Sequence, residues 1–274
     1  MRKITRITTQ KKHKHRYNIF LSTENGDEYG FSVDEDILIK FRLEKGMELD
    51  KEFIETLKKQ DNLHKVYTLT IHFLSYRIRS EKEVVTYLKK KEIDDEQIAE
   101  IMKRLAKEKL IDDQQFADMF VRSRMNSSSK GPKLIRQELY EKGIEGQIAE
   151  NALEQYTPAQ QKEKIQKLLS KKIKSTSKDS FQKQLNQAKN MILQKGFDQQ
   201  LVFSAIQTMD QEENVDQEWK ALKFQGEKLF QKHVKKHEGF QLKQKVMEGL
   251  YKKGFHFDMI QQFVDEHIEN RDEI

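Results

Sequence analysis

Hydrophobic and polar residues alternate along the first 33 residues, which is the pattern of β-strands with one buried face. The alternating apolar positions are Ile4, Ile7, Tyr17, Ile19, Leu21, Tyr29, Phe31 and Val33. Asn25-Gly26 predicts a hairpin turn between them, because both residues tolerate a positive φ. Acidic residues at 34–36 predict a helix start. With a second helix over 51–60, the chain is expected to begin with a β-strand/helix module over 1–62.

From about residue 63 the pattern becomes helical and repeats itself. A Lys-Gly/Glu-Ile/Phe motif recurs at 91–93, 142–144, 195–197 and 253–255. The same pattern of aliphatic residues precedes and follows each motif: Leu88, Leu139, Ile192 and Leu250 before it, and Ile98, Ile148, Val202 and Ile260 after it. A motif that returns about every fifty to sixty residues indicates stacked supersecondary units. The predicted repeats span residues 63–111 (repeat 1), 112–156 (repeat 2), 157–210 (repeat 3) and 211–274 (repeat 4).

Each repeat is predicted to contain three helices, with the motif at the turn after the second. Four helix starts are marked by side chains that cap backbone amides, some reciprocally: Ser80 with Glu83, Asp94 with Gln97, Asp112 with Gln115, and Thr157-Pro158. Glycine suits the left-handed turn position because it has no Cβ. Glu92 occupies that position in repeat 1, so this turn is expected to be slightly strained or differently shaped.

The helical core of repeat 1 and the loops between helices are also predicted. The expected core positions are Leu69, Phe73, Leu74, Ile78, Val84, Val85, Leu88, Ile98, Ile101, Met102 and Leu105. Polar segments 126–131 and 170–180 are expected to be loops, and 210–216 a hinge. Only 36% of residues are hydrophobic and 35% are charged, which favours small cores. The predicted fold is mainly α: tandem three-helix repeats in an elongated array after a β-hairpin/helix module.

Basic residues recur where the first helix of each repeat ends. The net charge is only +6, but residues 1–16 contain seven basic residues and no acidic one. The cations predicted to contact a partner or DNA are Arg77, Arg79, Arg122, Arg124, Lys130, Lys133, Arg136, Lys171 and Lys172. Such a basic stripe could follow a phosphate backbone or an acidic surface. Helix-end capping and solubility are the alternative explanation. Charge reversal at Arg122 and Arg124 is predicted to weaken partner binding without affecting unfolding.

Several chemistries find no support in the sequence. There is no cysteine, which excludes disulfides and thiolate sites. Lys130-Gly131-Pro132-Lys133 lacks the pattern of a phosphate loop. His233 and His237 have metal-ligand spacing, but neighbouring lysines would repel a cation, so no metal or other cofactor is expected. No segment has the length and apolarity of a membrane span, and a cytoplasmic protein without membrane contact is expected.

Three groups of residues within 65–156 match the pattern of a known family. They are Arg77, Arg79, Ser80 and Glu83 with Val84 and Leu88; Leu110-Ile111-Asp112-Asp113 followed by Phe116-Ala117; and Gly131-Pro132, Ile135, Glu138-Leu139 and Lys142-Gly143-Ile144. In these groups residues 65–156 resemble the RecX family. Repeats 3 and 4 and the N-terminal strands are similar, more loosely, to the longer RecX proteins. Glu92 departs from the family pattern, where glycine is usual.

The resemblance implies a non-enzymatic regulator that binds the RecA–single-stranded-DNA filament. It implies inhibition of filament extension, ATP hydrolysis and strand exchange, by a protein expected to be a monomer. Two other classes stay open on the residues alone. One is a stand-alone protein that binds single- or double-stranded DNA without RecA. The other is an inert helical scaffold that joins other proteins.

Overall fold

The computed structural model describes residues 1–173, 177–208 and 215–269. The chain divides into two compact units. The first comprises residues 1–116 together with 142–144, and the second comprises residues 117–141 and 145–274. The predicted hinge at 210–216 lies almost entirely outside the described residues, since only Val215 and Asp216 belong to a described helix.

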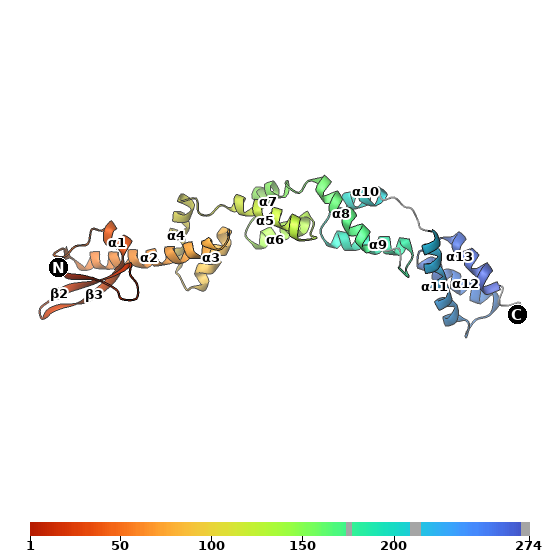
Figure 1. The fold of residues 1–274 in the computed structure, drawn as a ribbon, viewed down its shortest axis with the longest axis horizontal. Helices are drawn as coiled ribbons and strands as arrows, with labels where there is room; N and C mark the ends of the chain where they lie inside the picture. Colours follow the sequence, from red (N-terminus) through yellow and green to blue (C-terminus); the bar gives the residue numbers. More distant parts are fainter. Residues whose placement is uncertain (174–176, 209–214, 270–274) are drawn as a thin grey trace. The chain divides into compact units, whose positions relative to one another are not determined.

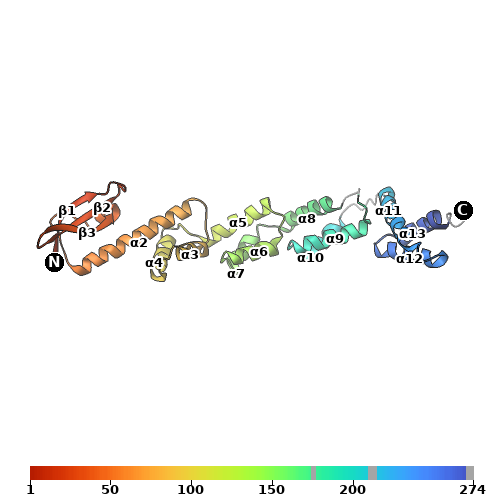
Figure 2. The same cartoon turned by 90° about the horizontal axis from the view of Figure 1, so that it is seen from below.

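The N-terminal module is an antiparallel sheet with two helices. Its strands are β1 (Arg2–Thr9), β2 (Arg16–Thr23), β3 (Gly26–Asp34) and β4 (Glu48–Leu49), in the order β3-β2-β1-β4. Helix α2 (Lys51–Ser75) lies beside the sheet in both views (Figures 1 and 2). The buried core is formed by Ile4, Ile19, Leu21, Phe31, Val33, Ile37, Leu43, Leu49, Ile54 and Leu57. The alternation along β1–β3 therefore predicted the strands, whereas the two-residue strand β4 was not predicted.

The hairpin differs from its prediction in two details. Thr23 pairs with Gly26, so the two loop residues are Glu24 and Asn25 rather than Asn25 and Gly26, and only Gly26 has a positive φ, of 124°. Further along, a register shift leaves Tyr29 opposite Phe20 and Phe31 opposite Ile19. Because of this bulge, the Tyr29 side chain points away from the core and is 56% exposed. The bulge breaks the alternation because an extra residue reverses the side-chain direction.

Two helices connect the sheet to the first repeat. Helix α1 (Glu35–Lys40) begins after Asp34, whose side chain accepts a hydrogen bond from the Asp36 amide, as predicted from the acidic residues there. Helix α2 continues from the predicted helix over 51–60 into the first helix of repeat 1 without a break. Because it ends at Ser75, Ile78 lies beyond the helix and is 37% exposed, so its predicted place in the core was wrong.

The remaining described helices follow the predicted groups of three. Repeat 1 continues with α3 (Glu81–Lys90) and α4 (Asp95–Lys107), and repeat 2 has α5 (Asp113–Ser127), α6 (Pro132–Glu141) and α7 (Gly146–Leu153). Repeat 3 has α8 (Pro158–Lys172), α9 (Phe181–Gln194) and α10 (Gln199–Gln207). Repeat 4 has α11 (Val215–His233), α12 (Gly239–Lys252) and α13 (Phe257–Val264), followed by a π-helical turn over Asp265–Glu269. Figure 2 shows α11, α12 and α13 as one group.

The predicted helix starts and turns are largely confirmed. Ser80, Asp94, Asp112 and Thr157 each accept a hydrogen bond from the backbone amide three residues on. Thr157 forms the complete reciprocal capping box with Gln160. All four motif turns have a positive φ at the middle residue: 60° at Glu92, 83° at Gly143, 85° at Gly196 and 86° at Gly254. The sequence motif therefore marks a left-handed turn in every repeat.

The aliphatic residues around each motif form the cores of the repeats. Leu88, Leu139, Ile192 and Leu250 are all fully buried. Among the residues predicted after the motif, Ile148 is the exception, because it is 37% exposed and the neighbouring Ala149 is buried instead. The predicted loops are also shorter than expected, since α5 extends to Ser127 and α8 to Lys172. Part of the second loop, residues 174–176, lies outside the described residues.

Three of the motif turns contact the start of a second helix from the preceding repeat. In the first unit, Ser80 Oγ donates to the Lys142 carbonyl at 2.7 Å. In the second unit, the Gly131 amide donates to the Lys195 carbonyl at 2.7 Å, and Ser180 Oγ donates to the Lys253 carbonyl at 2.5 Å. We call these three contacts the turn contacts. The residue just before the second helix supplies the donor each time, so the repeats share one mode of contact.

Candidate functional site

The two arginines predicted in repeat 1 are held by their own repeat. The Arg77 guanidinium donates two hydrogen bonds to the Glu83 carboxylate, both at 3.0 Å. Arg79 lies over the Phe73 ring, 4.1 Å from its centroid, and its Nε is buried with no hydrogen-bond partner in the described chain. Burial, followed by repulsion from Arg77, lowers the pKa of Arg79. Both side chains therefore have structural contacts that a partner would have to replace.

Two predicted cations of repeat 2 converge on one carboxylate. Arg124 Nε lies 2.7 Å from Glu138, and Lys130 also forms an ion pair with Glu138. Arg124 also lies 4.6 Å from the centroid of the Phe120 ring. Burial alone would raise the pKa of Glu138, but hydrogen bonds from Lys130 and Arg124 outweigh burial and lower it. Sequence reasoning used Glu138 only for the family resemblance and missed this role, because its partners lie eight and fourteen residues away.

Arg136 is paired as well, within repeat 2. Its guanidinium on α6 donates two hydrogen bonds to Glu150 on α7, at 2.7 and 2.8 Å. These bonds raise the pKa of Arg136 and lower the pKa of Glu150. Exposed ion pairs of this kind stabilise a fold by less than about 1 kcal/mol. Arg136 remains reachable by a partner, but binding there would have to compete with Glu150.

Four of the nine predicted cations stay available to a partner, and we call them the open cations. They are Arg122, Lys133, Lys171 and Lys172, all exposed. Arg122 makes one long hydrogen bond, of 3.4 Å, to the Gln155 side-chain amide. The side chains of the three lysines make no hydrogen bond or ion pair with any residue that the structure describes. All four belong to the second unit, on α5, α6 and α8.

Lys133 also lines a polar groove within the second unit. The groove has a volume of about 690 Å³ and is lined by Lys133, Lys189, Asp198, Gln199, Gln200 and Phe203. Phe203 is 54% exposed. Two ammonium groups beside an exposed ring can attract an anion and provide an apolar contact next to it. Of the residues lining the groove, sequence reasoning had singled out only Lys133.

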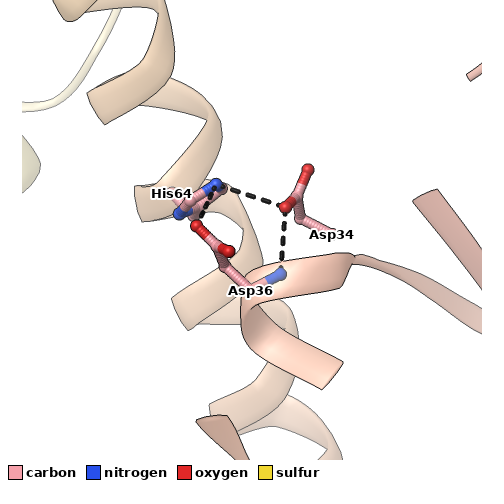
Figure 3. Close-up of side chains that lie close together, drawn as sticks. All are labelled: Asp34, Asp36 and His64. Atoms are coloured by element: carbon pink, nitrogen blue, oxygen red, sulfur yellow. Dashed lines mark hydrogen bonds and ion pairs between the residues drawn. The ribbon is translucent and has the colours of Figure 1, made fainter. Parts of the chain in front are cut away.

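Ionisable side chains also join the sheet to α2. His64 Nε2 lies 3.3 Å from Asp34 Oδ1 and 3.6 Å from Asp36 Oδ2 (Figure 3). Beside them, Arg16 forms an ion pair of 2.8 Å with Asp61. Burial alone would raise the pKa of Asp61, but hydrogen bonds from Arg16, Lys65 and the Asp34 amide outweigh burial and lower it.

The cluster around His64 is also the arrangement closest to a metal site in the described part of the chain. Its three donor atoms lie within 4.8 Å of one another. However, Asp34 Oδ1 already accepts the Asp36 amide hydrogen at the start of α1, as Figure 3 shows. A helix N-terminus carries a partial positive charge that opposes a cation. The geometry is therefore explained by helix capping and attachment to α2. His233 and His237, whose spacing resembles that of metal ligands, are not part of a cluster of three such groups in the described residues.

No helix in the described ranges combines the length and the apolarity that a membrane span requires.

Family models match four segments of the chain. They are the "Regulatory protein RecX N-terminal domain" at residues 2–50 and the first, second and third three-helix domains of RecX at 67–105, 112–153 and 216–264.

Curated relatives match over nearly the whole chain. The Regulatory protein RecX of Oceanobacillus iheyensis is 64% identical over 98% of this chain and 100% of its own length. The chain belongs to the RecX family. The Regulatory protein RecX of Halalkalibacterium halodurans is 38% identical, covering 96% of this chain and 99% of its own.

Solved structures of RecX proteins agree with this assignment. A crystal structure of regulatory protein RecX matches with a TM-score of 0.56 at 30% identity, covering 97% of this chain and 100% of that chain. The structure of RecX from Lactobacillus salivarius matches with a TM-score of 0.53 at 38% identity, covering 55% of this chain and 98% of that one. The fold prediction of three-helix domains after a small strand module is thus confirmed. Repeat 3 lies between the segments matched by the second and third three-helix family models.

Proposed function

We propose that this RecX protein is a non-catalytic cytoplasmic regulator that binds the RecA–single-stranded-DNA filament and restrains it. Binding inhibits filament extension, ATP hydrolysis and strand exchange, and so regulates recombination and DNA repair during the SOS response. The protein acts as a monomer, by occupying a surface, and needs no cofactor. Family membership supports this function, and the relatives carry the description "regulatory protein".

The observation that carries the proposal is the set of open cations. Arg122, Lys133, Lys171 and Lys172 lie on three helices of two successive repeats, and each can form a new ion pair without breaking an existing one. A filament of protein and DNA presents acidic groups and phosphates at regular intervals. Several weak contacts along one chain then act together through their effective concentration. The paired cations contribute less, because they must first leave Glu83, Glu138 or Glu150.

The test is single-stranded-DNA-dependent ATP hydrolysis by RecA, with this protein titrated in at physiological salt. We expect inhibition well below RecA stoichiometry. The test variant combines R122E, K133E, K171E and K172E, and we expect its half-inhibitory concentration to rise by about tenfold or more. The matched control combines K45E, K51E, K103E and K107E, which gives the same change in net charge on exposed lysines outside the predicted site. Arg124 is also among the predicted contact residues, but it is left unchanged because its charge reversal would break the ion pair with Glu138.

The outcomes of this test distinguish the proposed function from its alternatives. Equal inhibition by the test variant and the control would remove the open cations from the binding surface. Inhibition that requires enough protein to coat the DNA and disappears at moderately higher salt would show plain competition for phosphates. That result would favour the stand-alone DNA-binding alternative. Absence of inhibition at any ratio would overturn the proposed function.

A further inference from the structure

Repeat 4 exposes a group of aromatic side chains beside a groove. Phe240 is 80% exposed, Tyr251 67% and Phe257 59%. Together with Met247 and Val264 they line a cavity of about 740 Å³ between α12 and α13; the other lining residues are Lys243, Gln244, Glu248 and Gln261. Exposed large apolar side chains that gather in one groove mark an interaction site more often than scattered ones do.

The same positions in repeat 1 carry an ion pair. Aligning the turn at Lys253 with the turn at Lys91 places Tyr251 and Phe257 at the positions of Lys89 and Asp95. In repeat 1, Lys89 Nζ lies 3.1 Å from Asp95 Oδ1. Repeat 4 therefore has two aromatic rings where repeat 1 has a solvated salt bridge.

A second pair of positions differs in the same way from repeat 2. Aligning the turns at Lys253 and Lys142 places Met247 and Gln261 at the positions of Arg136 and Glu150. Arg136 and Glu150 form the paired ion contact described above. At each of these two pairs of positions, an ion pair of repeat 1 or repeat 2 is thus replaced in repeat 4 by aromatic or uncharged side chains. The packing of a repeat does not require apolar side chains at these positions, since repeats 1 and 2 have charged side chains there.

Phe240 occupies a position that, in the other three repeats, contacts the motif turn of the following repeat. It is the second residue of α12, as Lys82 is of α3, Lys133 of α6 and Gln182 of α9. Those three side chains lie against the glycines at 143, 196 and 254, where an added Cβ would meet each of them within 3.3 Å. Phe240 stands at the same place with its ring mostly in solvent. The groove is therefore continuous with the surface that forms the turn contacts in the other repeats.

The charge around the groove indicates the chemistry of its occupant. Residues 228–253 contain eight lysines and two glutamates, so this part of repeat 4 is strongly basic. Lys243 and Glu248 both line the groove itself, so the positive excess comes from the other lysines of this segment. An occupant that complements this surface carries carboxylates beside its apolar side chains. Met247 and Val264 offer no hydrogen-bonding group for the polar edge of a base, so the groove fits aliphatic and aromatic side chains better than nucleotides.

We propose that this groove binds an amphipathic, acidic peptide segment of a partner protein. The apolar side chains of the segment lie against Phe240, Tyr251 and Phe257, and its carboxylates face the surrounding lysines. This site is separate from the open cations, and the peptide-binding measurement that tests it uses neither RecA nor DNA. Its failure would consequently leave the proposed function untouched, and the reverse also holds.

The test measures binding of a labelled synthetic helix to the full-length protein by fluorescence anisotropy. The probe is an amphipathic peptide with leucines at i, i+3, i+4 and i+7 and glutamates elsewhere on its surface. Two control probes replace the leucines with serine or the glutamates with lysine. We expect both controls to bind about tenfold more weakly or worse.

The variant Y251K/F257D tests the groove directly, because it installs the ion pair of repeat 1 at the equivalent positions. We expect at least a tenfold loss of affinity for the acidic probe, with unchanged thermal unfolding. The matched control is Y140K, since Tyr140 is 62% exposed at the position in repeat 2 equivalent to Tyr251. This control should bind the probe like the unaltered protein.

Three results would overturn the proposal. The first is equal binding of the acidic and basic probes, and the second is unaltered binding by Y251K/F257D. The third is preference of the groove for another occupant. Self-association in sedimentation that Y251K/F257D abolishes, without probe binding, would identify a second copy of the chain as that occupant. Loss of single-stranded oligonucleotide binding in Y251K/F257D, without probe binding, would identify a nucleic acid.

Discussion

The turns of repeats 1 and 3 have the same backbone conformation but opposite surroundings. Glu92 has a φ of 60° and is exposed, whereas Gly196 has a φ of 85° and is buried. A Cβ added to Gly196 would lie 2.7 Å from the backbone nitrogen of Leu134. The left-handed conformation costs a residue with a side chain about 1–2 kcal/mol. A side chain can therefore occupy this conformation when nothing lies beside it, and the close contact is what demands glycine.

The other two turns fall between these extremes. A Cβ at Gly143 would lie 2.8 Å from Lys82 Cβ, and one at Gly254 would lie 3.2 Å from Ser180 Oγ. Both contacts are with side-chain atoms, whereas the nearest contact at Gly196 is with backbone, which has the least room to shift. The four turns thus form a series from open to tightly covered, which can be tested by substitution.

The largest effect is expected from Gly196→Ala. The new Cβ would add its positive-φ cost to a backbone clash, and together we expect a loss of about 3 kcal/mol. Urea denaturation followed by circular dichroism would measure it. The control is Gly146→Ala, because Gly146 has a φ of 56° with nothing within 4 Å of an added Cβ, so it should show the conformational cost alone. Equal losses in both variants would mean that the close contact has no energetic role.

The turn contact of repeat 1 is expected to depend on pH through Glu83. Its carboxylate forms ion pairs with Arg77 at 3.0 Å and with Lys142, in the motif turn, at 2.7 Å. Burial alone would raise its pKa, but the hydrogen bonds from Arg77 and Lys142 outweigh burial and hold it below the ordinary value of 4.5. A carboxyl whose pKa is lowered by folding stabilises the fold above its unfolded pKa, and this contribution disappears as the pH falls.

The variant Glu83→Gln isolates this contribution. At pH 7 we expect it to lower the free energy of unfolding by about 1 kcal/mol, because both partners are partly exposed. The difference from the unaltered protein should shrink as the pH falls below 4.5, because the unfolded chain then takes up a proton at Glu83 that the folded chain takes up only at lower pH. Unfolding midpoints measured at several pH values would show it. A difference that stays constant down to pH 3 would refute the assigned ion pairs.

Features that depend on neighbouring residues were predictable from the sequence. The helix caps at Asp94, Asp112 and Thr157, and the left-handed turns, rest on contacts within three or four residues. The same locality explains why the strained turn at Glu92 was foreseen. The fold class followed because the motif recurs and local signals agree at every copy.

Features that depend on distant partners were not predictable. Glu83 was expected to complete a capping box with Ser80, but its carboxylate turns to Arg77 and Lys142 instead. Nothing in the spacing of Arg124, Lys130 and Glu138 distinguishes paired cations from open ones. The predicted module boundary at residue 62 falls inside helix α2, next to Asp61, which is buried against Arg16 of the sheet. The candidate site could thus be named by residue type, while its division into paired and open cations required the structure.

The smallest effect is expected from Glu92→Gly, which makes the open turn resemble the covered ones. Glycine relieves the positive-φ cost, but it also gives the unfolded chain more freedom, so the net gain should be about 0.5 kcal/mol. The control is Glu92→Ala, which keeps a Cβ at the same φ and should leave stability nearly unchanged. Both are measured by the urea midpoint used for Gly196→Ala. A loss of stability in Glu92→Gly would show that the Glu92 side chain has a stabilising contact of its own. The turn of repeat 1 would then no longer be an example of a turn without close neighbours.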